Sequence, residues 1–182
     1  PSPVNGQMWY NSTDKAIKGF TSNPAGTWSS TASLNTARYQ LGGAGKLSTA
    51  ALVFGGSPPP APTAKAITEQ WNGTNWTETN DMNTARNALS GAGVYASSIG
   101  FAGNPAGSAV AITEEWNGTN WTEVNDLNAA KFIGGSSGTQ TSALFYGGAP
   151  GPVTASNESW NGTNWTELND LNTARAFVAG GG

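Results

Sequence analysis

Short apolar runs separated by turn residues dominate the pattern of this 182-residue chain. Three of these runs, at residues 50–56, 98–103 and 143–148, end in glycine. The segment Trp-Asn-Gly-Thr-Asn-Trp-Thr-Glu occurs three times, beginning at Trp71, Trp116 and Trp160. Asn and Gly between two aromatic residues favour a β-hairpin, because they accept the positive φ angles that hairpin loops require. The pattern therefore predicts an all-β protein rich in hairpins.

The same elements recur along the chain at nearly constant spacing. The sequence Asn-Thr-Ala-Arg ends at Arg38, Arg86 and Arg175, and the altered copy Asn-Ala-Ala-Lys ends at Lys131. Successive basic residues are 48, 45 and 44 residues apart, which is the range of a propeller blade. The interval from the first Trp of each hairpin to the next basic residue is constant, whereas the loop before the hairpin changes length. Insertions are tolerated best in exposed loops, so we expect rigid repeats with one variable loop each.

Each repeat is expected to contain four strands. The first strand is rich in small residues and is predicted at residues 41–45, 86–94, 132–135 and 177–180. The apolar run forms the second strand, and the two arms of the Trp hairpin form the third and fourth. Gly and Ala suit strands that crowd the axis of a ring of blades, and a flexible linker is the alternative. Residues 7–10 and 16–20 predict a separate N-terminal hairpin with a turn at residues 11–14.

The repeat resembles a kelch-type repeat over residues 27–182. It has an Arg, an apolar residue and small residues, then a strand closing in Gly55-Gly56 or Gly147-Gly148, with Ala102-Gly103 as a near match. A variable loop, two aromatic residues framing a turn, and an Asn-Asp-Leu ending follow. The resemblance implies a kelch-like β-propeller of four-stranded blades that serves as a binding platform. The family usually has Tyr and Trp where this chain has Trp71 and Trp76, and it has more blades, so the match is to a kelch-like variant.

A second resemblance concerns the near-verbatim Trp repeats and the stretch at residues 6–20. Both resemble repeats in tail-fibre and other virion proteins of tailed bacteriophages. The resemblance implies a location in a virion or on an extracellular surface, and a bacterial surface protein is the alternative.

The repeats define the expected domains and the number of blades. Residues 27–182 form the repeat region, with units at 35–82, 83–127 and 128–171 and a partial unit at 172–182, and residues 1–26 precede it. We predict four blades, the last closed by both termini, with residues 176–179 paired with the N-terminal hairpin, because closure removes open sheet edges. The rival interpretation is a fragment of a longer propeller, or an oligomer that shares blades.

Composition narrows the chemistry that this chain can perform. Only 10% of residues are charged and the net charge is −3, so the basic field that nucleic acids require is absent. There is no Cys and no His, which removes thiolate catalysis, the usual zinc sites and His-based proton transfer. No stretch approaches 18 apolar residues, so no membrane insertion is expected. We expect no cofactor, no metal and no nucleic-acid partner.

The hairpin register places carboxylates opposite each other. With a four-residue loop at residues 72–75, Trp71 faces Trp76 and Glu69 faces Glu78, and the other two hairpins repeat this arrangement. Facing carboxylates repel, so a cation site, an acid/base pair for glycoside cleavage, or a basic side chain from each repeat is required, unless the glutamates are solvated. Two structural explanations are favoured: that Arg38, Arg86, Lys131 and Arg175 each reach a carboxylate between blades, or that the glutamates are solvated at an edge. A pair repeated in every blade is structural in logic, whereas an active site is usually built once.

The remaining candidate residues are aromatic residues and loop residues. The hairpin tryptophans Trp71, Trp76, Trp116, Trp121, Trp160 and Trp165 either pack between blades, which is favoured, or stack on sugars. Arg38, Arg86, Lys131 and Arg175 are expected to be structural. The candidate ligand-binding residues are Trp9 and Tyr10, which do not repeat, and residues of the variable loops: Pro58, Pro59, Pro60, Asn104, Pro105, Pro150 and Pro152.

Three functions are compatible with these patterns. The first is a non-enzymatic virion component, such as a tail fibre, spike or appendage, whose loops bind a receptor or a cell-surface glycan. The second is a purely structural module that contacts other virion or filament subunits, including copies of itself. The third is a propeller glycosidase, which is disfavoured because the repeats supply equivalent carboxylates where a glycosidase needs two in different environments.

Overall fold

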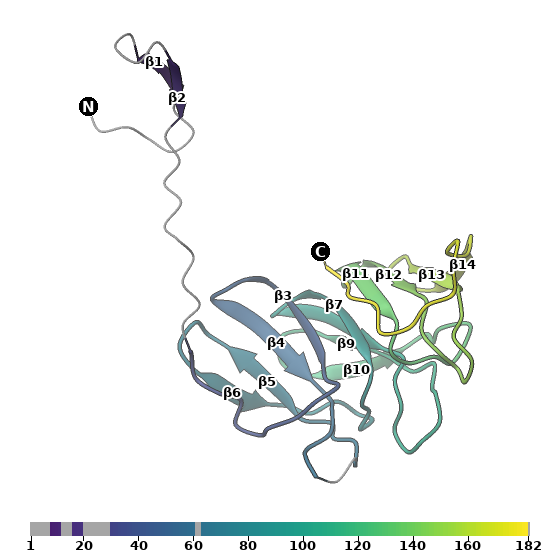
Figure 1. Ribbon diagram of the computed structural model, residues 1–182. Helices are drawn as coiled ribbons and strands as arrows, with labels where there is room; N and C mark the ends of the chain where they lie inside the picture. Colours follow the sequence, from purple (N-terminus) through teal and green to yellow (C-terminus); the bar gives the residue numbers. More distant parts are fainter. Residues whose placement is uncertain (1–7, 12–15, 20–29, 61–62, 182) are drawn as a thin grey trace. The chain divides into compact units, whose positions relative to one another are not determined.

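The computed structural model describes residues 8–11, 16–19, 30–60 and 63–181 (Figure 1). The chain divides into two compact units, Pro1–Thr31 and Ala32–Gly182. In the first unit, β1 (Met8–Asn11) pairs with antiparallel β2 (Ala16–Gly19), with Met8 opposite Gly19. The predicted N-terminal hairpin is therefore observed, and the side chains of Trp9 and Tyr10 lie outside the described residues.

The second unit consists of three four-stranded antiparallel sheets, which we call blades 1, 2 and 3. Blade 1 contains β3 (Gly42–Leu47), β4 (Ala50–Phe54), β5 (Thr68–Trp71) and β6 (Trp76–Thr79). Blade 2 contains β7 (Ser90–Val94), β8 (Ser97–Phe101), β9 (Thr113–Trp116) and β10 (Trp121–Val124). Blade 3 contains β11 (Gly135–Thr139), β12 (Ser142–Tyr146), β13 (Asn157–Trp160) and β14 (Trp165–Leu168). The all-β prediction and the four strands of each unit are confirmed.

The first strands of the blades pack against one another. β7 lies between β3 and β11 and contacts both (Figure 1). Each first strand begins after a residue with positive φ at the same place in the repeat, namely Gln40, Ala88 and Ile133. These sharp turns explain why β7 begins at Ser90 and β11 begins at Gly135, so the strands predicted at residues 86–94 and 132–135 were placed too early at their starts.

Small residues in the first strands permit this close packing. A Cβ atom at Gly91 would lie 2.5 Å from Cζ of Phe54 and 2.9 Å from the carbonyl oxygen of Gly43. Ser136 of β11 also donates a hydrogen bond of 2.8 Å to the carbonyl of Gly91. The glycine-rich segments are therefore packed strands rather than linkers.

Aromatic side chains fill the space between neighbouring blades. Phe54 of blade 1 meets Trp121 of blade 2 edge to face, with ring centroids 4.8 Å apart. Phe101 of blade 2 meets Trp165 of blade 3 in the same way, also at 4.8 Å. Burying each such indole contributes about 2 to 3 kcal/mol to stability. The tryptophans thus join each blade to the next through two core clusters, one between blades 1 and 2 and one between blades 2 and 3.

The C-terminal segment repeats the contacts with which blades 2 and 3 begin. Gly148 N donates to Arg175 O over 2.8 Å, as Gly56 N donates to Arg86 O over 2.8 Å. Phe177 has positive φ and donates its N–H to Ile133 O over 2.8 Å. Residues 175–181 nevertheless form no strand with the described part of the chain. The predicted pairing of residues 176–179 with the N-terminal hairpin stays a prediction.

One further feature concerns membranes. Within the described ranges, the structure contains no helix long and apolar enough to cross a bilayer.

We predict that Gly91→Ala lowers the free energy of unfolding by about 1 to 3 kcal/mol, because the added methyl overpacks the contact between β7 and blade 1. Gly151→Ala is the matched control, since no atom lies within 4 Å of a Cβ built there. Urea denaturation of both variants measures the effect. Equal stabilities would show that the first strands are not closely packed.

Candidate functional site

Each blade begins with a polar turn that closes on a buried glutamate. In blade 2, Oε2 of Glu114 accepts hydrogen bonds from the backbone N and Nδ2 of Asn83, at 2.7 and 2.9 Å. Nη1 of Arg86 lies 3.0 Å from Oε1 of the same carboxylate, and both side chains are fully buried. Asn83 Nδ2 also donates to the carbonyl of Trp121 over 3.1 Å. The turn, the third strand and the fourth strand are thereby fixed by one carboxylate.

The other two blades repeat this arrangement. Arg38 pairs with Glu69 at 2.7 Å, and Lys131 pairs with Glu158 at 3.0 Å. In these blades the second carboxylate oxygen accepts hydrogen bonds from Asn35 and Asn128. Each basic turn residue therefore binds the glutamate of its own blade, and the expectation that it reaches a carboxylate between blades was wrong. Only the backbone of these residues makes the contact between blades, as the carbonyls of Arg86 and Lys131 accept hydrogen bonds from Gly56 and Gly103 of the preceding blades.

The facing glutamates have different surroundings, as the register pairs Glu69 with Glu78, Glu114 with Glu123 and Glu158 with Glu167. The third-strand glutamate of each pair is buried, whereas the fourth-strand glutamate is exposed to solvent. Burial lowers the pKa of the Arg86 guanidinium from its ordinary value, and the charge of Glu114 opposes this shift. A buried charge requires such a partner, so the basic residue is the compensation that the sequence requires. No group of three acidic, His or Cys side chains that could hold a metal occurs among the described residues.

Arg175 differs from the other three basic residues. Its guanidinium Nε donates to the carbonyl of Thr173 over 3.3 Å, and the residue is exposed. No carboxylate among the described residues forms an ion pair with it.

The hairpin tryptophans form tilted pairs with ring centroids 5.4 to 5.5 Å apart. The tip of each hairpin is held by its first Asn, as when Asn72 Oδ1 accepts from the N–H groups of Thr74 and Asn75. All of these tryptophans are buried except Trp76, which is half-buried. The buried indoles pack inside the protein, where no sugar can stack on them.

Some structural residues escaped the sequence interpretation. Nε1 of Trp121 donates to Oγ1 of Thr68 in the preceding blade over 2.9 Å, and Nε1 of Trp165 donates to Oγ1 of Thr113 over 3.0 Å. The acceptor threonine always stands three residues before the first Trp of its hairpin, but only the fold shows that its partner belongs to the next blade. Asn80 likewise bonds to the hairpin tip of blade 2, and Asn125 to that of blade 3.

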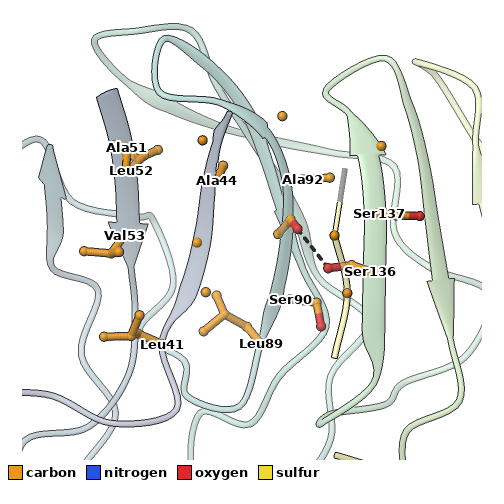
Figure 2. Close-up of a pocket in the computed structure, with 18 of the residues that line it drawn as sticks. Leu41, Ala44, Ala51, Leu52, Val53, Leu89, Ser90, Ala92, Ser136 and Ser137 are labelled. Atoms are coloured by element: carbon orange, nitrogen blue, oxygen red, sulfur yellow. Dashed lines mark hydrogen bonds between the residues drawn. The ribbon is translucent and has the colours of Figure 1, made fainter. Parts of the chain in front are cut away.

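A cavity of about 460 Å³ lies between the first strands of the three blades (Figure 2). Apolar side chains such as Leu41, Val53 and Leu89 line it, together with glycines and the hydroxyls of Ser90, Ser136 and Ser137. Figure 2 shows the hydrogen bond of Ser136 to the backbone of β7 across this space. The lining contains no titratable side chain, so it offers neutral hydroxyl and apolar contacts.

The variable loops at residues 57–63, 104–108 and 149–154 leave the blades at one end, beside the polar turns. Isolated bridges join Ser57 to Tyr39, Asn104 to Asn87 and Ala149 to Phe132. The C-terminal end of each loop is held by a hydrogen bond to the glycine that precedes the loop in every repeat, as when Val110 N donates to Gly103 O over 3.0 Å. The hairpin tips lie at the opposite end of the blades. Gly73, in the first hairpin tip, lies so close to Thr49, in the turn between β3 and β4, that an added Cβ atom would contact it.

The candidate ligand-binding prolines occupy these loops. Pro59, Pro60, Pro150 and Pro152 are exposed, whereas Pro58, Asn104 and Pro105 are half-buried. The structure therefore gathers the loop candidates at one end of the blades. It describes no side chain of Trp9 or Tyr10 in relation to them.

In comparisons with known proteins, neither the protein-family models nor the curated proteins gave a match to this chain.

We predict that Glu114→Gln destabilises the protein by about 3 to 5 kcal/mol, because it leaves the buried Arg86 guanidinium without its countercharge. Glu123→Gln, at the exposed partner position on the neighbouring strand, is expected to change stability by less than about 0.5 kcal/mol. Thermal and urea unfolding of the two variants give the comparison. Similar losses in both would mean that the ion pair does not hold the junction.

Proposed function

We propose that this chain is a non-enzymatic, kelch-like propeller module that presents its variable loops to a receptor. The observation that carries the proposal is the position of these loops: all three leave their blades at the same end. The proposed location is a phage virion, in a tail fibre, spike or appendage, and it rests on the resemblance of the Trp repeats to virion proteins.

The contrast between constant and variable positions supports a display function. The ion pairs, the Trp pairs and the hairpin tips recur with nearly the same distances in every blade, which makes a rigid support. The loops differ in both length and sequence from one blade to the next. Binding residues are commonly carried by loops on such a support, and rigid loops lose little entropy on binding.

The chemistry of the loops favours a neutral ligand. Their sequences, Ser-Pro-Pro-Pro-Ala-Pro-Thr, Asn-Pro-Ala-Gly-Ser and Ala-Pro-Gly-Pro-Val-Thr, contain no charged residue. They offer hydroxyls, amides, backbone groups and the flat faces of proline rings. These groups suit the hydroxyls and apolar faces of a cell-surface glycan, which is the ligand class that we propose.

The state of the carboxylates supports a binding function over catalysis. Glu69, Glu114 and Glu158 are all held in buried ion pairs and accept backbone N–H bonds. A carboxylate fixed in this way stabilises the fold, whereas a glycosidase needs an acid that can exchange protons with a substrate.

We further propose that the blades belong to a ring of four, with the last blade closed by both termini. The C-terminal segment supports this proposal, because its backbone contacts at Arg175 and Phe177 repeat those that begin blades 2 and 3. In such a ring, the ion-pair partner of Arg175 would belong to the fourth blade, just as the partners of Arg38, Arg86 and Lys131 belong to blades 1, 2 and 3.

A structural module that assembles with other subunits is the second candidate. It is favoured by the outer surfaces of the three-blade unit, where Trp76 is half-buried and Leu168 is 42% exposed. Apolar groups at the two ends of a row of blades could contact neighbouring subunits.

We predict that replacing residues 104–108 and 149–154 with Gly-Ser segments of equal length abolishes binding on a glycan array or to whole bacterial cells. The fold should persist, because the strands and ion pairs lie outside these loops. Thr163→Ala, in a hairpin tip at the opposite end of blade 3, is the control and should bind normally.

The same assay separates the two candidates. Binding that is lost with the loops supports receptor recognition. Binding that survives loop replacement, together with a concentration-dependent increase in mass in analytical ultracentrifugation, would favour the assembly module instead.

A further inference from the structure

A short backbone bridge stands beside each variable loop. In blade 1, Tyr39 and Ser57 donate their backbone N–H groups to each other's carbonyl oxygens, over 3.0 Å in both directions. Asn87 and Asn104 form the same bridge in blade 2, and Phe132 and Ala149 form it in blade 3. The backbone therefore has the same pairing at this place in all three blades, whatever the side chains are.

The side chain at the first position of the bridge changes from blade to blade. This residue directly follows the basic turn residue, which is always Arg or Lys. The residue itself is Tyr39, Asn87 and Phe132 in the three blades, and Ala176 in the C-terminal segment. A fixed backbone with a changing side chain is also the character of the loop beside it, so this position belongs to the same variable surface.

Tyr39 is the exposed aromatic residue that stands beside a variable loop. It is 42% exposed. The other exposed aromatic residues in the described ranges are Tyr95, in the turn between β7 and β8, and Phe177, in the C-terminal segment. Neither core cluster contains Tyr39, so its ring is not committed to the packing between blades.

The pairing also places a polar group beside this ring. Directly paired residues of an antiparallel bridge have their side chains on the same face. The hydroxyl of Ser57 accepts a hydrogen bond of 2.8 Å from Nδ2 of Asn87, so this face is directed toward blade 2. Oδ1 of Asn87 accepts no hydrogen bond among the described residues, which leaves it as an acceptor for a ligand.

We propose that Tyr39 is the stacking platform for a neutral sugar ring, and that Oδ1 of Asn87 accepts a hydrogen bond from one of the sugar's hydroxyl groups. The faces of an aromatic ring are partially negative, so they attract the weakly positive C–H groups of a sugar. This inference rests on the loop-display function proposed above, and it assigns the glycan contact to the junction of blades 1 and 2.

The charges around Tyr39 favour a neutral sugar over a charged one. The neighbouring Arg38 side chain is fully buried in its ion pair with Glu69, so it offers no charge to a ligand. Residues 57–60, which begin at the bridge, contain no charged side chain. The paired backbone also holds Tyr39 in place before binding, which lowers the entropy that is lost when a ligand binds.

The test compares Tyr39→Ala and Tyr39→Phe with Tyr95→Ala. Tyr95 is the matched control, because it is 46% exposed near the hairpin tips, and its carbonyl rather than its ring accepts the N–H of Trp116. We expect Tyr39→Ala to weaken the binding of a neutral glycoside by about tenfold, because the stacking surface is lost. Tyr39→Phe keeps that surface and should bind within about threefold of the wild type.

The probes are the methyl glycosides of glucose, galactose, mannose and N-acetylglucosamine. Each is titrated into the full chain, and the ring signals of the four tyrosines are followed by nuclear magnetic resonance, with Tyr39 assigned by the loss of its signal in Tyr39→Phe. We expect the Tyr39 signal to move with at least one glycoside while the Tyr95 signal stays in place. Asn87→Leu, which removes the acceptor, should weaken the same binding by about fivefold.

Two results overturn the proposal. The first is a Tyr39 ring signal that responds to none of the glycosides. The second is equal binding by Tyr39→Ala and the wild type, or an equal loss in Tyr39→Ala and Tyr95→Ala, since either would show that the Tyr39 ring makes no specific contact.

The loop experiment separates this inference from the proposed function. Binding that is lost with the loops but kept in Tyr39→Ala leaves the display function standing and removes the stacking platform. A wild-type protein that binds no glycan on the array and no bacterial cell removes the display function, and the stacking platform with it.

Discussion

The buried carboxylate at the start of each blade is the constraint on which the rest of the structure depends. Glu114 accepts the N–H groups of one turn, neutralises Arg86 and sits beside the amide that holds the carbonyl of Trp121. Because a buried charge is stable only with its partner in place, the turn, the third strand and the fourth strand must form together. The turn also connects two blades, so the same ion pair fixes how the next blade begins. The same ion pair, formed once in each of the three blades, thus determines the arrangement of the whole unit.

Packing between blades follows from that arrangement. The turn brings the second Trp of one hairpin against the Phe of the preceding blade, and a threonine accepts its N–H. A large aromatic ring with a satisfied polar atom fills the gap without leaving an unpaired group. The first strands approach closely at the other edge of the sheet, where glycine leaves room for Phe54. Small residues in the first strands and large aromatic residues in the other strands together let neighbouring blades pack closely.

Much of this could be predicted from the sequence, because the information is local. The register of Trp71 with Trp76 and of Glu69 with Glu78 follows from a four-residue loop and the two-residue period of a strand. Charge balance predicted that a basic residue of each repeat would reach a carboxylate, but not that Arg38 would pair with Glu69 of its own blade. The start of β11 was missed because the positive φ at Ile133 falls on a β-branched residue, which gives no turn signal. The acceptors Thr68 and Thr113 were also missed, since their partners lie more than 50 residues away and belong to another blade.

The repeat also explains why binding chemistry is sought in the loops. A side chain that recurs in every blade is already committed to the ion pair, the indole contact or the hairpin tip, and changing it would loosen a junction. The loops are joined to the blades by backbone bridges at residues such as Ser57 and Asn104. This attachment does not depend on the identity of the other loop side chains. Variation can therefore accumulate there without cost to the packing between blades. In a repeat protein of this design, one set of repeat positions stabilises the fold, and a different set, in the loops, is available for contacts with other molecules.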